Sequence, residues 1–338
     1  MRLYYGFVRI CLLTNQDIDS PDFPEDDWRC DPRPYYPEAE WEVGYLDDKE
    51  TSVADVEALV AKEFDLFFNL CDGCESEDDN PGIEVVQTLE RLGIPYTGAT
   101  SGFWEPTREQ IKKVCRKNKI ATPKSVRVKD DPSFERALKK LKFPMFVKHY
   151  SSYASIDISR HSRVTTEAGL LRQVNKIVAK HGAALVEEFI EGAECTVLVA
   201  ENPKEPSSPL TFTPIQYQFP EGDTFKHEGL KWEESQFSQM KAAPVLDREL
   251  ASRLRTESAI LFTGLNGTGF GRCDMRISRE GIPYMLEINP NCGIYYPLDA
   301  AGSADFILQN DPLGHVGFTK NLIDAAFARH NKKIRVSR

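Results

Sequence analysis

The sequence has no uninterrupted apolar run close to the roughly 20 residues that a membrane-spanning helix needs. It also has no excess of basic residues, because 42 lysines and arginines face 52 aspartates and glutamates and give a net charge of −10. A broad surface that neutralises a nucleic-acid backbone is therefore not expected, although a local basic pocket for a small anion is compatible with this balance. We expect neither a membrane protein nor a nucleic-acid-binding protein.

Cysteine is present, but without the spacing of a disulfide framework or a zinc site. The eight cysteines are scattered, several of them within apolar runs, which favours free thiols in a reducing compartment. The one Cys-x-x-Cys pair, Cys71 and Cys74, has no second pair or histidine cluster to complete a metal site. The apolar opening YYGFVRICLL is interrupted by Arg9, and no small-residue cleavage site follows it. We therefore expect a first strand rather than a signal peptide, and a cytoplasmic protein.

The chain of 338 residues, 41% hydrophobic, is long enough for two or three packed modules. Its first hundred residues alternate strand-like apolar runs with helical runs, which is typical of a parallel sheet with crossover helices. The predicted strands are residues 8–13, 41–46, 65–70 and 94–98, and the predicted helices are residues 53–64 and 82–93. The polar, proline-rich segment 16–37 predicts a long loop or insertion, and such long connections are often functional.

A different pattern follows, with a strand-rich end. The predicted helices of this part are residues 106–120, 133–142, 167–182 and 318–330, and the predicted strands are residues 123–128, 144–150, 183–190, 194–201 and 210–220. Helices and strands in this order are typical of α+β modules. We find no internal repeat and no low-complexity tract.

The stretch GRCDMRISREGIPYMLEINPNCG, from Gly271 to Gly293, predicts a β-hairpin. A two-residue turn at Glu280 and Gly281 would place opposite one another the residues whose numbers add up to 561. The expected pairs are Met275 with Leu286, Ile277 with Tyr284, Cys273 with Ile288, Arg272 with Asn289, and Asp274 with Glu287. The first three pairs give an apolar face, and the last two give a polar face with two facing carboxylates.

Like charges directly opposite one another destabilise a sheet, so the facing pair Asp274 and Glu287 predicts a cation between them. Mg²⁺ prefers oxygen ligands and commonly shares one or two carboxylates with substrate phosphates; Asn289 adds an amide oxygen on the same face. Arg272 could neutralise a phosphate or a transition-state charge beside the metal. The alternative is a surface ion network in which Arg272 and Arg276 offset the two acids.

Other charged residues are candidates for a nucleotide site. Lys148 ends an apolar strand before a loop rich in small hydroxyl residues, as a phosphate clamp would, although a solvated surface lysine is the alternative. In the stretch EEFIEGAE, Glu187 could accept from an adenine amine and Glu194 from ribose hydroxyls, with a solvated acidic turn as the alternative. Arg108 and Lys112 share one face of the basic helix, and Lys231 adds a loop cation.

The order of these features resembles the ATP-grasp superfamily, and within it the D-alanine:D-alanine ligase branch. The resemblance covers the chain from about Asp65 to Pro297, and its strongest motifs are EEFIEGAE and GRCD followed by MLEIN. It implies an N-terminal parallel α/β domain (residues 1–101), a central ATP-grasp subdomain (102–182) and a C-terminal subdomain with the metal site (183–338). It also implies an ATP-dependent ligase that phosphorylates a carboxylate to an acylphosphate, which an amine attacks to form an amide.

The resemblance implies roles for individual residues. Asp274, Glu287 and Asn289 would hold two Mg²⁺ ions, with Mn²⁺ as an alternative, and Arg272 would stabilise the acylphosphate and the tetrahedral species. The implied nucleotide ligands are Arg108, Lys148 and Ser155 for the phosphates, Glu187, Phe189 and Ile190 for adenine, Glu194 for the ribose and Lys231 for the terminal phosphate. The implied substrate positions are Trp232, Gly293 and Tyr295. Partners would be a small carboxylate and an amine, and a homodimer is compatible with the resemblance.

The sequence departs from the family pattern mainly at the substrate side. The phosphate loop reads YASID without glycine, Trp232 replaces a tyrosine, and Tyr295, Tyr296 and Pro297 stand where small polar residues usually bind the second amino acid. The N-terminal motif that holds the first D-alanine is absent. We therefore expect a ligase for an amino acid or another small carboxylate that is not two D-alanines. Two alternatives stay open: a divergent D-alanine:D-alanine ligase, and a nucleotide-binding regulator without turnover.

Overall fold

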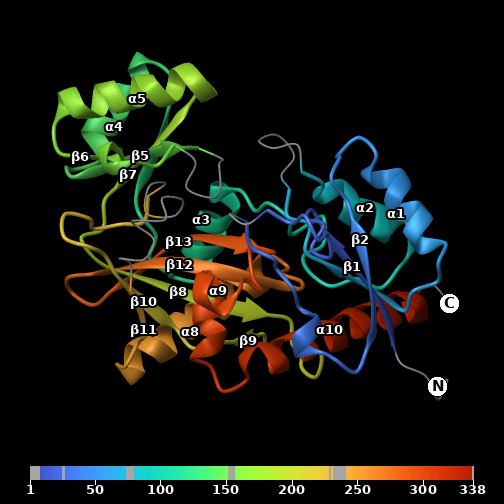
Figure 1. The fold of residues 1–338 in the computed structure, drawn as a ribbon. Helices are drawn as coiled ribbons and strands as arrows, with labels where there is room; N and C mark the ends of the chain where they lie inside the picture. The colour runs from blue at the N-terminus through green and yellow to red at the C-terminus, as the bar shows by residue number, and fades with distance from the viewer. Residues whose placement is uncertain are drawn as a thin grey trace.

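The computed structural model describes residues 8–24, 27–73, 80–150, 157–227, 230 and 241–336, and it contains three separate β-sheets (Figure 1). The N-terminal sheet is parallel and has the strand order β2-β1-β3. Its strands are β1 (Arg9–Thr14), β2 (Glu40–Tyr45) and β3 (Leu66–Asn69), with the helices α1 (Ser52–Val60) and α2 (Ile83–Leu92). The predicted parallel α/β order is confirmed, although the predicted strand at 94–98 makes only one bridge, from Tyr96 to Phe67.

The second sheet is antiparallel, with the order β4-β7-β5-β6, and the helices α4 and α5 lie on one side of it (Figure 1). Its elements are β4 (Ser125–Val128), α4 (Asp131–Lys140), β5 (Met145–His149), β6 (Arg163–Val164), α5 (Glu167–His181) and β7 (Ala184–Glu188), with a 3-10 turn at Arg160–Ser162. Local signals start both helices: the Asp130 side chain accepts from the Ser133 N–H, and that of Thr166 accepts from the Gly169 N–H. A separate hydrophobic cluster fills this module.

The third sheet is antiparallel, with the order β11-β10-β8-β12-β13, and β9 pairs with β8. Its strands are β8 (Gly192–Ala200), β9 (Leu210–Thr211), β10 (Ile215–Gln218), β11 (Lys241–Pro244), β12 (Phe270–Ser278) and β13 (Pro283–Pro290). The helices that accompany it are α3 (Arg108–Lys117), α8 (Arg248–Gly264), α9 (Ser303–Gln309) and α10 (Gly314–Val336), with 3-10 turns at Arg33–Tyr35 and Leu298–Ala300. The helix α8 was not predicted from the sequence; the Asp247 side chain caps it by accepting from the N–H groups of Glu249 and Leu250.

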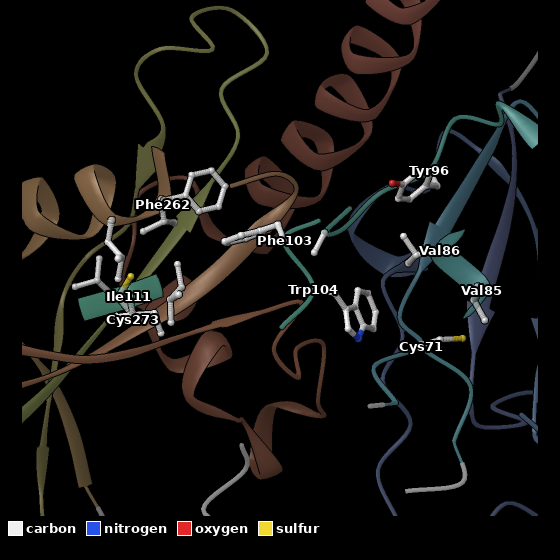
Figure 2. Packing of buried hydrophobic residues seen from close by; sticks show 14 of the residues in the cluster. Cys71, Val85, Val86, Tyr96, Phe103, Trp104, Ile111, Phe262 and Cys273 are labelled. Atoms are coloured by element: carbon white, nitrogen blue, oxygen red, sulfur yellow. The ribbon is translucent and has the colours of Figure 1, made fainter. Parts of the chain in front are cut away.

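Two hydrophobic clusters cover the two faces of this third sheet. The first joins Cys273, on β12, to Ile111 and Phe262 of the helices α3 and α8, and extends to Val85 and Val86 of α2 in the N-terminal module (Figure 2). The second joins the other face to β1, α9 and α10. The N-terminal and C-terminal modules therefore share continuous cores, whereas the central module has its own. No helix of the described residues is long and apolar enough to cross a membrane.

The hairpin β12–β13 has the predicted register near the carboxylates and a different one near its turn. Arg272 faces Asn289 and Asp274 faces Glu287, as predicted, but the register shifts between Asp274 and Met275. The turn has three residues, 279–281, because the Ser278 N–H donates to the Ile282 carbonyl at 2.9 Å. Gly281, with φ +77°, completes this turn.

The predicted two-residue turn was therefore wrong, and so were two of the predicted pairs. Met275 faces Met285 instead of Leu286, and Ile277 faces Pro283 instead of Tyr284. Leu286 is the extra residue of β13 at a β-bulge, and it compensates the longer turn. Met285 takes the fully buried position that we had assigned to Leu286.

Candidate active site

Two carboxylates from neighbouring strands form the centre of the candidate site. Asp274 of β12 lies opposite Glu287 of β13. Arg272 binds Asp274 in a bidentate manner, with Nε at 3.0 Å from Oδ1 and Nη2 at 2.9 Å from Oδ2. Arg108, from α3, donates to Glu287 at 2.8 Å. Each acid therefore has its own guanidinium, so the two facing charges are offset.

Asp274 accepts two further hydrogen bonds that fix its position. The hydroxyl of Thr196, on β8, donates to Oδ1 at 2.7 Å, and the amide nitrogen of Asn289 donates to Oδ2 at 3.0 Å. Burial alone would raise the pKa of Asp274, but Arg272, Lys226 and the Thr196 hydroxyl outweigh it and lower the pKa to about 2. Burial also opposes ionisation of Glu287, and Arg108 and Lys148 lower its pKa in turn. Both acids are ionised at neutral pH.

The residues around this pair fit a hard divalent cation. Within the described residues there is no group of three His, Cys, Asp or Glu side chains that could hold a metal by themselves. The site instead offers two ionised carboxylates and the side-chain amide of Asn289, and Mg²⁺ typically uses one or two carboxylates together with substrate phosphates. Asp274, Glu287 and Asn289 are therefore the residues that would hold magnesium in this chain.

A second ionic cluster surrounds Glu187, which lies at the end of β7 and is only 4% exposed. Its carboxylate binds Lys148 of β5 at 2.7 Å and Lys112 of α3 at 2.8 Å. Together with Arg108, these lysines place three cations beside the two acids Glu187 and Glu287. Lys148 lies near the end of β5, and its role at the phosphates stays a prediction. Lysines hold both carboxylate oxygens of Glu187 in this structure, and its contact with an adenine amine stays a prediction.

The EEFIEGAE segment is held by Arg276 of β12. Its guanidinium donates to the Ile190 carbonyl at 2.6 Å and to Glu194 at 3.2 Å, and it stacks over the Phe189 ring at 4.6 Å. Arg276 faces Glu194 across β8 and β12, so it pairs with that acid and not with the hairpin acids that we had considered. Phe189 and Ile190, predicted to contact adenine, thus lie together beside a fixed arginine, and burial raises the pKa of Glu194.

The predicted substrate residues separate into two environments. Tyr295 is 2% exposed; its hydroxyl pairs with Thr319 of α10 at 2.9 Å, and it belongs to the second hydrophobic cluster. Its side chain is a core residue, which corrects the prediction that it contacts substrate. Gly293 differs, because a Cβ at this position would lie 2.7 Å from the Tyr296 hydroxyl. A side chain at position 293 would therefore have to displace the Tyr296 hydroxyl.

The long segment 16–37 lies against the region that follows β13. Trp28 packs edge-on to Tyr296 with their centroids 5.9 Å apart, and the Asp31 N–H donates to the Tyr295 carbonyl at 3.2 Å. The sequence alone does not decide whether this segment lines the pocket or makes a subunit contact. Its described residues pack on the chain's own C-terminal module, beside the predicted substrate glycine. The only signal for this in the sequence is a tryptophan within a polar loop.

Three predicted residues, Ser155, Lys231 and Trp232, lie outside the described residues. Lys226, in contrast, was not predicted and lies inside the site. Its ammonium is 3.1 Å from the Ser303 hydroxyl and 3.7 Å from the centre of the Tyr217 ring. Burial lowers the pKa of Lys226 to about 8, and Arg272 acts in the same direction. Its position before Lys231 in the FKHEGLK stretch did not distinguish it from a surface lysine.

Comparisons with known proteins agree with this geometry. The D-ala D-ala ligase C-terminus family matches residues 117–296, which is more than half of the chain. A D-alanine–D-alanine ligase of Cupriavidus metallidurans is 26% identical over 266 residues, covering 75% of this chain and 77% of the relative.

Two solved structures share the fold at low sequence identity. The Bacillus anthracis D-alanine–D-alanine ligase complexed with ATP has a TM-score of 0.69 at 19% identity, covering 97% of this chain and 99% of that one. A D-Ala:D-Ser ligase of Enterococcus faecalis has a TM-score of 0.68 at 16% identity, covering 95% and 100%. These matches confirm the predicted fold class and resemblance. The chain therefore belongs to the D-alanine–D-alanine ligase-like family of ATP-grasp enzymes, which are ATP-dependent carboxylate–amine ligases.

Proposed function

We propose that this protein joins the carboxylate of a small substrate, in the simplest case an amino acid, to the amine of a second substrate. The two substrates are not both D-alanine. The observation that carries the proposal is the facing pair of ionised acids, Asp274 and Glu287, with the cation cluster of Arg108, Lys112 and Lys148 beside it. A chain with a net charge of −10 gathers cations here. A triphosphate with divalent ions would complete that balance of charge.

The proposed reaction has two steps. A carboxylate oxygen of the first substrate attacks the γ-phosphorus of ATP, and ADP leaves. The amine nitrogen of the second substrate then attacks the acyl carbon, inorganic phosphate leaves, and the nitrogen loses a proton. Divalent ions, two Mg²⁺ or Mn²⁺, would supply neutralisation of the phosphate charge when they are bound.

The protein's own contribution is positioning and charge. Asp274 occupies the Nε and Nη2 groups of Arg272, and no described residue accepts a hydrogen bond from Nη1. This end of the guanidinium is suited to an oxyanion that develops at the reacting acyl group. Arg108 and Lys148 are suited to phosphate oxygens, because each is a cation with little exposure to water, and each would exchange a carboxylate partner for a phosphate.

Two features support a substrate pair other than two D-alanines. Tyr295 belongs to the core, and Trp28 with Tyr296 places bulky aromatic rings next to Gly293. Large rings at this position change the shape of the acceptor side without touching the acid pair, and such changes alter specificity more than chemistry.

The test is ADP release from ATP and Mg²⁺ across a matrix of amino-acid pairs and simple carboxylates, with product mass determined for each positive pair. We expect release that requires both a carboxylate and an amine, and a product whose mass equals the sum of the two substrates minus water. Silence with every pair would overturn the proposal.

A second candidate is D-alanine:D-alanine ligation, which the name of the Cupriavidus relative favours. The pair D-alanine plus D-alanine belongs in the same matrix. Formation of D-alanyl-D-alanine at a kcat/KM higher than that of any other pair would favour this candidate over the first.

A further inference from the structure

A salt bridge joins the central module to the C-terminal module, and neither of its residues has a role in the site described above. Arg160, in the 3-10 turn before β6, donates from Nε to Oδ1 of Asp223 at 2.8 Å and from Nη2 to Oδ2 at 2.9 Å. Asp223 lies in the connection between β10 and β11, in the C-terminal module. The Arg160 side chain is 60% exposed, whereas that of Asp223 is 2% exposed. Exposed ion pairs usually contribute little, but a two-point contact with a carboxylate removed from water is stronger and fixes the geometry.

Asp223 is held in place by its own module. The Nε2 atom of His227, whose side chain is also buried, lies 3.1 Å from Asp223 Oδ1. Between these two residues, the Thr224 carbonyl accepts from Arg276 of β12 at 2.9 Å. Residues 223–227 are therefore anchored to the third sheet. Arg160 thus binds a carboxylate whose position follows that of the C-terminal module.

A second contact between the same two modules lies two residues further along this connection. The Phe225 ring is edge-on to Phe146 of β5, with centroids 5.1 Å apart, and edge-on to Phe189 at 5.9 Å. Phe189 directly follows β7, and both Phe225 and Phe189 are buried. Edge-on aromatic pairs stabilise a contact beyond the apolar area that they bury. One short segment of the C-terminal module therefore makes an ionic and an apolar contact with the central module.

The candidate site needs both modules in a fixed arrangement. Lys148 and Glu187 lie on the central sheet, whereas Asp274 and Glu287 lie on the third sheet. The central module has its own core, and the chain connects it to the elements of the third sheet through residues 118–124 and 189–191 (Figure 1). A module with its own core and short connections can move as a unit. Contacts between the modules therefore set how close the proposed phosphate ligands come to the acid pair.

We propose that the pair Arg160–Asp223 is a latch, which holds the central module against the C-terminal module while nucleotide is bound and opens when nucleotide is exchanged. This inference rests on the proposed ligase function and extends it. A nucleotide that contacts both modules binds tightly only to their closed arrangement, so its apparent affinity follows the fraction of closed molecules. Arg160 and Asp223 are positioning residues, because they act on the reactants through the placement of Lys148 relative to Glu287.

The test uses Arg160→Gln and Arg160→Lys in the full chain, with Arg91→Gln as the matched control. Arg91 is 53% exposed and pairs with Glu57 at 2.6 Å within the N-terminal module. For Arg160→Gln we expect the KM for ATP to rise about 3- to 10-fold, while kcat changes less than about twofold because saturating ATP restores the closed arrangement. Arg160→Lys keeps the charge but loses the two-point contact, so its KM should lie between those of wild type and Arg160→Gln. The control should have the KM of wild type.

A double variant and a measurement of shape test the latch more directly. In an Asp223→Asn background, Arg160→Gln should raise the KM for ATP by less than about 1.5-fold, because the partner of Arg160 is already lost. By small-angle scattering without nucleotide, Arg160→Gln should have a larger radius of gyration than wild type. This difference should disappear when both proteins are saturated with ADP and Mg²⁺.

Other outcomes would overturn the inference. An unchanged KM for ATP in Arg160→Gln, with or without a lower melting temperature, would leave the pair as a structural contact. A lower KM would mean that the contact keeps nucleotide out, and a lower kcat at unchanged KM would assign Arg160 to the reaction itself. An equal effect of Arg160→Gln in wild type and in the Asp223→Asn background would show that Arg160 does not act through Asp223.

Failure of the ligase proposal can be told apart from failure of the latch. If wild type releases no ADP with any substrate pair, calorimetric titration with ADP and Mg²⁺ takes the place of the KM measurement. Binding that is about 3- to 10-fold weaker in Arg160→Gln than in wild type would support the latch. Equal binding by the two proteins would overturn it, and so would the absence of nucleotide binding by wild type.

Discussion

Replacing Glu187 by glutamine tests whether the cluster beside the acid pair is held by charge. The carboxylate binds Lys148 at 2.7 Å and Lys112 at 2.8 Å, and all three side chains are largely removed from water. Burial opposes its ionisation, but the two lysines and Arg108 outweigh burial and lower the pKa of Glu187 from its ordinary 4.5 to about 2. Burial has the opposite effect on Lys148 and lowers its pKa. Arg108 acts in the same direction, and Glu187 opposes both. Two ammonium groups therefore share the charge of Glu187.

The magnitude follows from linkage between protonation and folding. A folded pKa of about 2 against 4.5 in the unfolded chain corresponds to about 3 kcal/mol of stability at neutral pH. Removing one partner from a buried ion pair costs a similar amount, about 3–5 kcal/mol, because the remaining charges lose their counter-ion. We therefore expect Glu187→Gln to lower the free energy of unfolding at pH 7 by about 3 kcal/mol.

The sign of the pH dependence follows from the lowered pKa. A carboxylate with a lowered folded pKa stabilises the protein above its unfolded pKa, and this contribution is lost as the pH falls toward the folded pKa. The difference in the free energy of unfolding between wild type and Glu187→Gln should thus be smaller at low pH than at pH 7. We expect it to be smaller by about 0.4 kcal/mol at pH 4.5 and by more than about 1 kcal/mol at pH 3.5.

The assay is equilibrium urea unfolding of both proteins from pH 7 to pH 3.5, with Glu135→Gln as the matched control. Glu135 pairs with Lys139 one helical turn away, at 3.6 Å, and both side chains are well exposed. This control should change stability by less than about 0.5 kcal/mol. A Glu187→Gln variant as stable as the control would refute the reasoning. So would a difference in the free energy of unfolding between wild type and Glu187→Gln that stays constant as the pH falls.

Three further predictions concern single side chains. Tyr295→Phe removes the hydroxyl bond to Thr319 and should lower the free energy of unfolding by about 1 kcal/mol in a denaturant series, whereas a large rise in a substrate KM would restore the substrate role that we rejected. Gly192→Ala should destabilise the fold by more than about 2 kcal/mol in thermal unfolding, because φ is +146° and the new Cβ would lie 1.9 Å from the Ile277 carbonyl oxygen; wild-type stability would contradict this. Asp274→Asn should lower kcat for ADP release about 100-fold or more, and retention of a tenth of the activity would argue against a role at the phosphates.

The parts of the site that could be predicted from the sequence are those set by local periodicity. Alternation along the two strands places Asp274 and Glu287 on the same face, and their predicted pairing is confirmed because the bulge at Leu286 offsets the extra residue of the turn. The same alternation could not reveal the bulge at Leu286, because Met285 and Leu286 are both apolar and either could take the buried position. The predicted turn failed for the same reason, and the helix α8 was missed within a mixed stretch.

The parts that could not be predicted depend on contacts between distant segments. Glu187 meets Lys112 only because α3, which packs against β13 and α8, brings this lysine to the end of β7, and no spacing in the sequence brings the two residues together. Tyr295 follows a motif at which the family binds substrate, but the segment 16–37 and α10 enclose its ring in the core. Lys226 can be told apart from a surface lysine only once the partners of the other cations are known.

Because of the bulge in β13, a change in length at the hairpin turn need not shift the position of the acid pair. Leu286 lies between the turn at 279–281 and Glu287, and it already absorbs a one-residue mismatch without moving Glu287 away from Asp274. A peptide tag or an added residue at that exposed turn should therefore be accommodated upstream of the carboxylates. The tip of this hairpin is a site where an engineer could insert a reporter and still keep the chemistry intact.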